Sequence, residues 1–149
     1  MELSIHKDEY FMGEALKQAQ LAFDAGEVPV GAVVVAEKRI IARAHNQTEQ
    51  LNDVTAHAEM LAITAAANAV GGKYLNECTL FVTLEPCIMC AGAAYWSQLG
   101  RVVYGASDEK RGFSTVGRNL LHPRTEVKSG LLSEDSEDLL NRFFAKLRN

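Results

Sequence analysis

The sequence predicts an α/β fold of three layers, in which helices cover both faces of a central sheet. Two observations predict it: helical and strand-like segments alternate along the chain, and the strand-like segments are nearly unbroken apolar runs. A strand that is apolar at every position is typical of one covered on both faces. With 149 residues, the chain is long enough to bury a sizeable core. We therefore assign residues 1–149 to one domain.

The first elements are a helix and two strands. Residues 8–25 carry apolar side chains at helical spacing, with Asp8 as the expected N-cap and Gly26 as the residue that ends the helix. The β-branched run at 29–36 predicts a buried strand. A short turn then leads into a second predicted strand at 39–46.

The central part of the chain predicts a helix, a strand and a further helix. Residues 56–70 follow a polar loop and predict a helix with Thr55 as N-cap. This helix is apolar on all sides, so we expect it to be deeply packed. Residues 78–84 predict another buried strand. Pro86 suits the first turn of a helix that continues to about residue 98.

The last third predicts one strand, an irregular stretch and a helix. Residues 101–106 read as a strand, and 107–125 are irregular and rich in Gly, Arg and Lys. Residues 133–148 carry a periodic set of Leu and Phe side chains and predict the final helix.

Composition and charge exclude several protein classes. The chain is 48% hydrophobic and 23% charged, and no apolar run is long enough to cross a membrane. The first ten residues are polar and charged, so we expect no signal peptide. The net charge is −4, but residues 97–128 carry 6 basic and 3 acidic side chains, a balance of +3. Such a basic stretch is either a phosphate-binding surface or ordinary solvated surface.

Two of the three cysteines, Cys87 and Cys90, lie close together in "EPCIMC". Three is an odd number, which argues against a full disulfide framework and fits a reducing cytosol. The pair has three interpretations: a redox couple, half of a zinc site, or two buried side chains. Cys78 has no partner at metal-binding spacing and reads as a small buried residue.

The stretch "TAHAEM" adds His57 and Glu59 at the start of another predicted helix. Two thiolates and one imidazole give three zinc ligands, one fewer than a closed structural site, and the free position suits a water molecule. Helix N-termini favour the thiolate form of Cys87 and Cys90. Glu59 is too close to His57 in sequence to be a convenient second ligand. It is well placed as a general base beside a zinc-bound water.

Two other classes remain open from these residues alone. A structural zinc module needs a fourth ligand, for which His45 and His6 are the available histidines, although neither has convincing spacing. A thiol-disulfide oxidoreductase needs reversible oxidation of Cys87 and Cys90 and no metal.

The joint pattern H-A-E followed by P-C-I-M-C resembles the signature of the zinc-dependent nucleobase deaminases. The flanking stretches "GEVPVGAVVV", "TLFVTLEPCIMCAGA" and "GRVVYGASDEKRG" resemble the bacterial tRNA-specific adenosine deaminases of the cytidine deaminase-like superfamily. The resemblance implies a five-stranded mixed sheet, a cytoplasmic homodimer and one Zn²⁺ per subunit. It further implies deamination of adenosine to inosine at wobble position 34 in the anticodon stem-loop of an arginine tRNA.

The resemblance also implies residue roles. His57, Cys87 and Cys90 would bind zinc, and Glu59 would be the catalytic proton shuttle. The expected substrate-binding residues are Asn46, which would hydrogen-bond the flipped nucleoside, Val30 and Leu84, which would line the base pocket, and Asp108, which would approach a ribose. Without the family, these four would read as a turn residue, two core residues and an exposed carboxylate.

The basic stretch supplies three further candidates, Lys110, Arg111 and Arg118, for contacts with phosphates. One departure from the family pattern is the pair Tyr95 and Trp96, which resembles the guanine deaminases of the same superfamily. Guanine or another free base is therefore the alternative substrate. The other interpretation of Trp96 is a packing residue, at a dimer interface for example.

Overall fold

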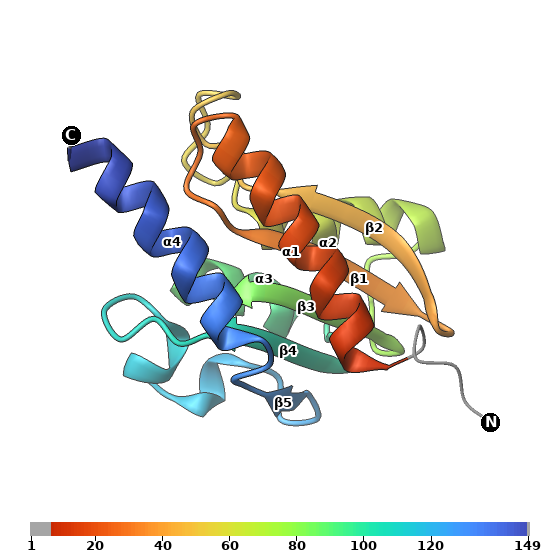
Figure 1. The fold of residues 1–149 in the computed structure, drawn as a ribbon. Helices are drawn as coiled ribbons and strands as arrows, with labels where there is room; N and C mark the ends of the chain where they lie inside the picture. The colour runs from red at the N-terminus through yellow and green to blue at the C-terminus, as the bar shows by residue number, and fades with distance from the viewer. Residues whose placement is uncertain (1–6, 149) are drawn as a thin grey trace.

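The computed structural model describes residues 7–148, which fold around one five-stranded sheet (Figure 1). The elements, in chain order, are α1 (Asp8–Asp24), β1 (Gly31–Ala36), β2 (Arg39–His45), α2 (Ala58–Val70), β3 (Cys78–Leu84), α3 (Ile88–Trp96), β4 (Arg101–Ala106), the short 3-10 helices η2 (Phe113–Thr115) and η3 (Arg118–Leu120), β5 (Glu126–Lys128) and α4 (Ser133–Arg148). The strand order is β2-β1-β3-β4-β5. Strand β1 is antiparallel to β2 and β3, whereas β3, β4 and β5 are parallel, so the sheet is mixed as expected.

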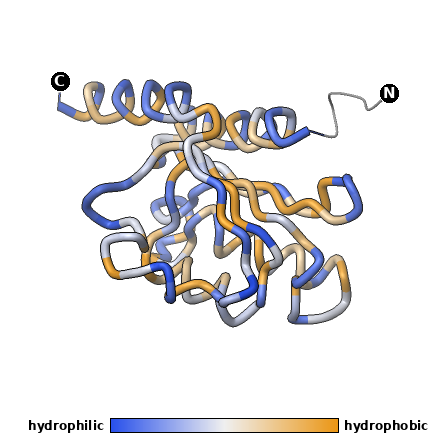
Figure 2. The backbone as a smooth tube through the Cα atoms, turned by 90° about the horizontal axis from the view of Figure 1, so that it is seen from below, coloured by the Kyte–Doolittle hydropathy of each residue, from blue (hydrophilic) through white to orange (hydrophobic). Residues whose placement is uncertain are grey.

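Helices cover both faces of the sheet, which confirms the three layers. Helices α1 and α4 form one layer, seen at the top of Figure 2; apolar side chains of α1 pack on Val33, Val35, Phe81 and Val103, and α4 lies against β3 and β4. Helices α2 and α3 cover the opposite face, where small residues such as Ala62 pack on the alternate strand positions. Because successive strand side chains point to opposite faces, β1 must be apolar throughout. Among the described residues, no helix has the length and apolarity that a membrane span requires.

The sheet topology brings four chain segments to one edge. Strands β3 and β4 are parallel, so Leu84 pairs with Ala106 and both strands end together. Strand β1 runs the other way, so the residue before it, Val30, lies at the same edge. Strand β2 ends beside the start of β1, and this places Asn46 there too, where its backbone N–H donates to the carbonyl of Val30. Residues far apart in sequence therefore meet at this edge.

The boundaries of the strands agree with the sequence to within two residues. β1 begins at Gly31 rather than at 29, and β3 and β4 have the expected bounds. A Cβ at Gly31 would lie 2.1 Å from the carbonyl oxygen of Ala15, so only glycine allows α1 to approach β1 so closely. Glu37 and Lys38 both have positive φ, the geometry of a two-residue hairpin turn between β1 and β2.

Helix α4 begins at Ser133 as predicted, whereas the predicted starts of the other three helices were wrong by one or two residues. The N-caps are Lys7, His57 and Cys87, instead of Asp8, Thr55 and a first turn that contains Pro86. Thr55 is not a cap because both its N–H and its hydroxyl donate to the Asp53 carboxylate, which closes a separate turn. The shift has a functional consequence, since it puts potential metal ligands at the N-cap positions of α2 and α3.

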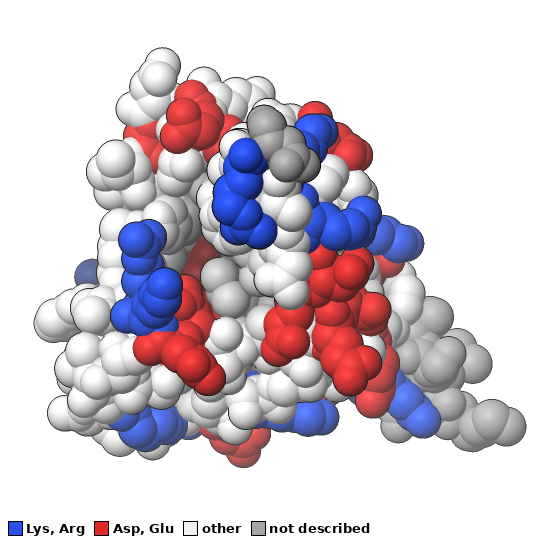
Figure 3. Space-filling view, turned by 60° about the vertical axis from the view of Figure 1, so that its left-hand side comes forward, with Lys and Arg blue, Asp and Glu red and all other residues white. Residues whose placement is uncertain are grey.

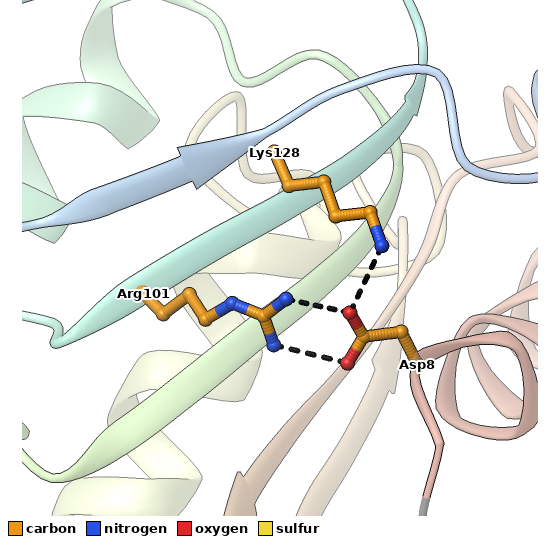
Figure 4. Close-up of polar contacts among 3 residues, drawn as sticks. All are labelled: Asp8, Arg101 and Lys128. Atoms are coloured by element: carbon orange, nitrogen blue, oxygen red, sulfur yellow. Dashed lines mark hydrogen bonds and ion pairs between the residues drawn. The ribbon is translucent and has the colours of Figure 1, made fainter.

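Asp8 is the first residue of α1 and ties this helix to the sheet (Figure 4). Its carboxylate accepts two hydrogen bonds from Arg101, at 3.0 and 2.5 Å, and one from Lys128 at 3.2 Å. The hydrogen bond from Arg101 lowers the pKa of Asp8 below its usual value, against a smaller opposing effect of burial. The carboxylate of Asp8, which the sequence suggested as a helix cap, therefore links α1 to β4 and β5 through ion pairs.

Two further expectations need correction. The residues alone did not indicate β5, because its three residues are exposed; only the family resemblance implied a fifth strand. Helix α2 is not deeply packed on all sides: its buried residues are Ala58, Glu59, Ala62 and Ala66, and its last residues up to Val70 are exposed. An apolar helix face is thus left uncovered in the single chain.

Candidate active site

Three potential metal ligands converge at the edge of the sheet where β3 and β4 end and β1 begins. His57 is the N-cap of α2, Cys87 is the N-cap of α3, and Cys90 lies in the first turn of α3. The Nδ1 atom of His57 is 3.7 Å from the sulfur of Cys87 and 3.5 Å from that of Cys90. All three ligand atoms lie within 4.8 Å of one another, which is close enough for one metal ion to contact them together.

The electrostatics of the cluster favour a thiolate. Hydrogen bonds from Cys90 and His57 lower the pKa of Cys87 to about 4, although burial opposes them. The same Cys87–Cys90 hydrogen bond, together with burial, raises the pKa of Cys90, and the bond to Cys87 raises that of His57. Metal binding replaces these shared protons. One imidazole and two sulfurs form a donor set that zinc prefers, so the group fits one Zn²⁺ per subunit with a fourth position open.

A closed structural site is not favoured by the residues that the structure describes. Among residues 7–148, His57, Cys87 and Cys90 are the only such group of His, Cys, Asp and Glu. His45 is engaged elsewhere: its ring nitrogens lie 3.5 Å from the Gln18 side chain and 3.3 Å from that of Gln47. His6, the other candidate for a fourth ligand, lies outside the described residues.

Glu59 projects from the first turn of α2 into the same pocket. It is only 4% exposed, and burial raises the pKa of its carboxyl from 4.5 to about 7. No salt bridge to Glu59 is present among residues 7–148. A buried carboxyl with a pKa near neutrality can both accept and donate a proton at physiological pH.

A pocket of about 760 Å³ opens beside the ligand cluster. Figure 3 shows a hollow on this face of the molecule, with both Lys/Arg and Asp/Glu groups at its rim. The lining combines residues from all four segments at the sheet edge with residues from α4: Val28, Val30, Asn46, Thr48, His57, Ala58, Glu59, Leu84, Glu85, Cys87, Ser107, Asp108, Glu109, Lys110, Arg111, Leu140 and Phe144. The pocket therefore contains every substrate-binding residue named from the sequence except Arg118.

Asn46 is held in place by the backbone around it. Its side-chain N–H donates to the carbonyl of Val28 at 3.2 Å, and its side-chain oxygen accepts from the N–H of Thr48 at 3.4 Å. An amide has two N–H donors and two acceptor lone pairs, so one of each remains for a ligand. Asn46 is thus a fixed polar group on an otherwise apolar wall formed by Val30 and Leu84.

Asp108 organises the basic loop at the rim. Its Oδ1 accepts hydrogen bonds from the backbone N–H groups of Lys110, at 3.2 Å, and Arg111, at 3.0 Å. Its other oxygen accepts no hydrogen bond from the described residues. The Lys110 and Arg111 side chains form no ion pair within residues 7–148.

Two sequence-selected residues lie outside the pocket. Arg118 donates to the backbone carbonyls of His122 and Thr125, so its guanidinium has a structural role in the 118–125 segment. The side chain of Trp96 is 77% exposed at the end of α3, and its ring packs on that of Tyr95 at 5.5 Å. Neither aromatic ring lines the pocket of the single chain.

Comparisons with known proteins agree with this geometry. Residues 5–106 match the family model for the cytidine and deoxycytidylate deaminase zinc-binding region. The tRNA-specific adenosine deaminase of Aquifex aeolicus is 49% identical over 146 residues, which cover 95% of this chain and 96% of that protein. The chain belongs to the tRNA-specific adenosine deaminases. A solved structure from a study of A-to-I editing by tRNA:A34 deaminases has a TM-score of 0.82 and 43% identity, covering 88% of this chain and 99% of that one.

The same fold also occurs in guanine deaminases. A structure of the guanine deaminase from Nitrosomonas europaea has a TM-score of 0.79 at 26% identity, covering 93% of this chain and 85% of that chain. The much higher identity to the tRNA-specific adenosine deaminases, and the position of Trp96 outside the pocket, favour the family assignment made from the sequence.

Leu140, Phe144 and Glu85 are among the pocket-lining residues whose side chains the sequence interpretation missed. Leu140 and Phe144 come from α4, and only the three-dimensional packing brings that helix to the pocket. Glu85 is 3% exposed and lies between β3 and α3. A detectable signal existed for Glu85, because a charged residue directly after a buried strand needs hydrogen-bond partners or a function.

Proposed function

We propose that this protein catalyses the zinc-dependent hydrolytic deamination of adenosine to inosine at wobble position 34 of an arginine tRNA. The observation that carries the proposal is the convergence of His57, Cys87 and Cys90 beside the buried carboxyl of Glu59, within one pocket. Membership of the tRNA-specific adenosine deaminases supports the substrate, and the structural relative from the study of tRNA:A34 deaminases supports the position. We assign the whole chain to one deaminase domain in the cytoplasm.

Each group at the centre has one role in this proposal. His57, Cys87 and Cys90 hold the zinc ion, which when bound lowers the pKa of a water molecule so that it can attack at neutral pH. Glu59 accepts a proton from the attacking water and delivers it to the ring nitrogen of adenine. Glu59 then takes the proton of the new hydroxyl group on C6 and transfers it to the exocyclic nitrogen, so that the C6–N bond breaks, ammonia leaves and the carbonyl of inosine forms. In the metal-free protein, burial raises the pKa of this carboxyl to about 7, so its protonated and ionised forms are both accessible at neutral pH.

The pocket walls bind the base that is turned out of the anticodon loop. Val30 and Leu84 pack against the faces of the base, and Asn46 offers one donor and one acceptor to the nucleoside. Asp108 contacts a neighbouring ribose hydroxyl through the carboxylate oxygen that accepts no hydrogen bond from the described residues. Bases in an anticodon loop are already partly unstacked, so turning one out costs little free energy.

Lys110 and Arg111 contact phosphates of the RNA. They stand at the pocket rim with no ion-pair partner among the described residues, in the stretch 97–128 that carries a balance of +3. The remainder of the chain is acidic, which discourages non-specific binding to nucleic acid.

The functional unit is a homodimer. Trp96, Ile88 and Val70 are large apolar side chains that are at least 47% exposed on α2 and α3. The uncovered faces of these two helices together form an apolar surface of the kind that a subunit interface buries. In this arrangement Trp96 is an interface residue and not a specificity residue.

A substrate panel tests the proposal. Zinc-loaded protein is offered an anticodon stem-loop with a wobble adenosine and, in parallel, free guanine, adenosine and cytidine, and both ammonia and inosine are measured. We expect inosine in the stem-loop and no ammonia from the free compounds. Ammonia from guanine with an unchanged stem-loop would overturn the substrate while leaving the zinc chemistry intact.

A further inference from the structure

Glu85 is a buried carboxylate that the proposed chemistry does not use. It follows β3 and precedes the zinc ligand Cys87 by two residues, and it is only 3% exposed. No Lys, Arg or His within residues 7–148 forms an ion pair with it. An ionised carboxylate is costly to bury unless hydrogen bonds replace its water shell. The partners of Glu85 therefore indicate its purpose.

Within residues 7–148, the three hydrogen bonds that the Glu85 carboxylate accepts all come from one loop, residues 107–114. Its Oε1 accepts from the N–H of Asp108 at 3.0 Å, and its Oε2 accepts from the N–H and the hydroxyl of Ser114 at 3.0 and 2.6 Å. The carboxylate thus joins the two ends of the loop. A Cβ at Gly112 would lie 2.3 Å from this carboxylate, so the loop wraps closely around it.

The backbone strengthens the same connection. The N–H of Glu85 donates to the carbonyl of Ala106 at 2.8 Å, and the N–H of Phe113 donates to the carbonyl of Pro86 at 2.9 Å. The loop is therefore attached to the short segment that leads into Cys87. Since Asp108 in turn fixes the backbone of Lys110 and Arg111, one chain of contacts runs from the metal site to the basic rim.

We infer that Glu85 is a positioning residue for the RNA substrate: it holds the 107–114 loop so that Asp108, Lys110 and Arg111 face the pocket. The inference rests on the proposed function, because it assumes that this loop contacts RNA. An apolar side chain at position 85 would leave two backbone N–H groups of the loop without acceptors, so packing alone does not explain a carboxylate there. The role is in binding, because both carboxylate oxygens of Glu85 already accept hydrogen bonds from the loop.

Glu85→Gln tests the inference with little change of shape. A glutamine has only one acceptor oxygen, so the backbone N–H at one end of the loop, that of Asp108 or Ser114, loses its acceptor and faces the side-chain NH₂ group instead. We expect KM for the stem-loop to rise about tenfold while kcat stays within about threefold, as for a loss of substrate binding. We also expect zinc content equal to that of the wild type and faster hydrogen exchange at the amides of Asp108 and Ser114.

Glu27→Gln is the matched control. Glu27 is a second buried carboxylate, 1% exposed, and it accepts from the N–H groups of Glu49, at 3.0 Å, and Gln50, at 2.7 Å, in the loop on the other side of the pocket. In this variant we expect faster exchange at Glu49 and Gln50 and unchanged exchange at Asp108 and Ser114. The comparison of the two variants therefore separates a local effect of each carboxylate on its own loop from a general loss of stability.

Other outcomes would overturn the inference. An unchanged KM in Glu85→Gln, or a loss confined to kcat, would exclude a positioning role in RNA binding, as would equal exchange changes in both variants. If Glu85→Gln does not fold, Ser114→Ala removes one donor only, and its KM is expected to rise about threefold, whereas an unchanged KM excludes the role. Failure of the proposed function can be told apart from failure of the positioning role of Glu85, because in the first case the wild-type protein itself would leave the stem-loop unmodified.

Discussion

Replacing Glu59 by glutamine is expected to separate activity from stability. The variant keeps the size of the side chain and removes the group that accepts and returns the proton. General acid–base catalysis contributes roughly 10²- to 10⁴-fold to a rate, so we expect kcat to fall by about that factor. KM for the stem-loop and zinc content should stay close to those of the wild type, because Glu59 is not one of the three convergent ligands.

The expected effect on stability has the opposite sign. Burial raises the pKa of Glu59 from 4.5 to about 7, so the folded protein binds more protons than the unfolded chain between these values. The free energy of unfolding therefore falls as the pH rises through this window, by roughly 3 kcal/mol for a change of this size. Glutamine cannot ionise, so metal-free Glu59→Gln should be more stable than metal-free wild type at pH 8 and should lose this advantage below pH 4.5.

Two assays measure these quantities. Inosine formation in the stem-loop gives kcat and KM, and urea unfolding of the metal-free proteins at pH 8 and pH 4 gives the stability difference. Glu77→Gln is the control, because Glu77 is an exposed carboxylate that does not line the pocket. A Glu59→Gln variant with wild-type kcat would refute the assigned role. A variant less stable than wild type at pH 8 would refute the argument from burial.

Three further predictions concern the rim and the fold. Asp108→Asn should change the preference for RNA over DNA at equal zinc content, since the amide keeps the acceptor for the loop and alters the free oxygen; an unchanged preference would exclude the ribose contact. Charge reversal of Lys110 and Arg111 should weaken tRNA binding and reduce the salt slope by roughly one per side chain, and equal slopes would contradict phosphate contacts. Asp8→Asn should lower the free energy of unfolding by about 1 kcal/mol at pH 7. Because Arg101 lowers the pKa of Asp8, this contribution is lost as the pH falls below 3.8, and a difference that persists there would contradict the ion pair.

The sequence predicted strands β1, β3 and β4 well because these strands are buried on both faces. The continuous apolar runs that became β1 and β3 have no competing helical interpretation, and their bounds were confirmed to within two residues. The strand β5 was not visible in the residues, because three exposed positions carry no hydrophobic pattern. Helix starts were displaced because a polar side chain such as Thr55 can bond to a neighbouring turn as readily as to a helix end.

The centre of the site could be predicted and its walls only in part. The sequence reveals the central residues because metal binding and acid–base chemistry require particular side chains at short spacing within each motif. These residues are His57, Glu59, Cys87 and Cys90. Phe144 reaches the pocket because α4 packs on the sheet. A contact between segments so far apart in the sequence leaves no local sequence pattern.

Hydrogen-bond partners can also give a residue selected from the sequence a different role. Arg118 was selected from the charge of its stretch, but backbone carbonyls take up its guanidinium. Charge counts along a sequence cannot anticipate such contacts.

The most direct test of the central claim is to locate inosine in a full-length arginine tRNA after incubation with the zinc-loaded protein. The account predicts inosine at position 34 and at no other adenosine, and none with Cys87→Ala protein that has lost its zinc. Inosine at several positions, or a tRNA that remains unmodified while a free base is deaminated, would contradict the claim that this pocket acts on the wobble adenosine.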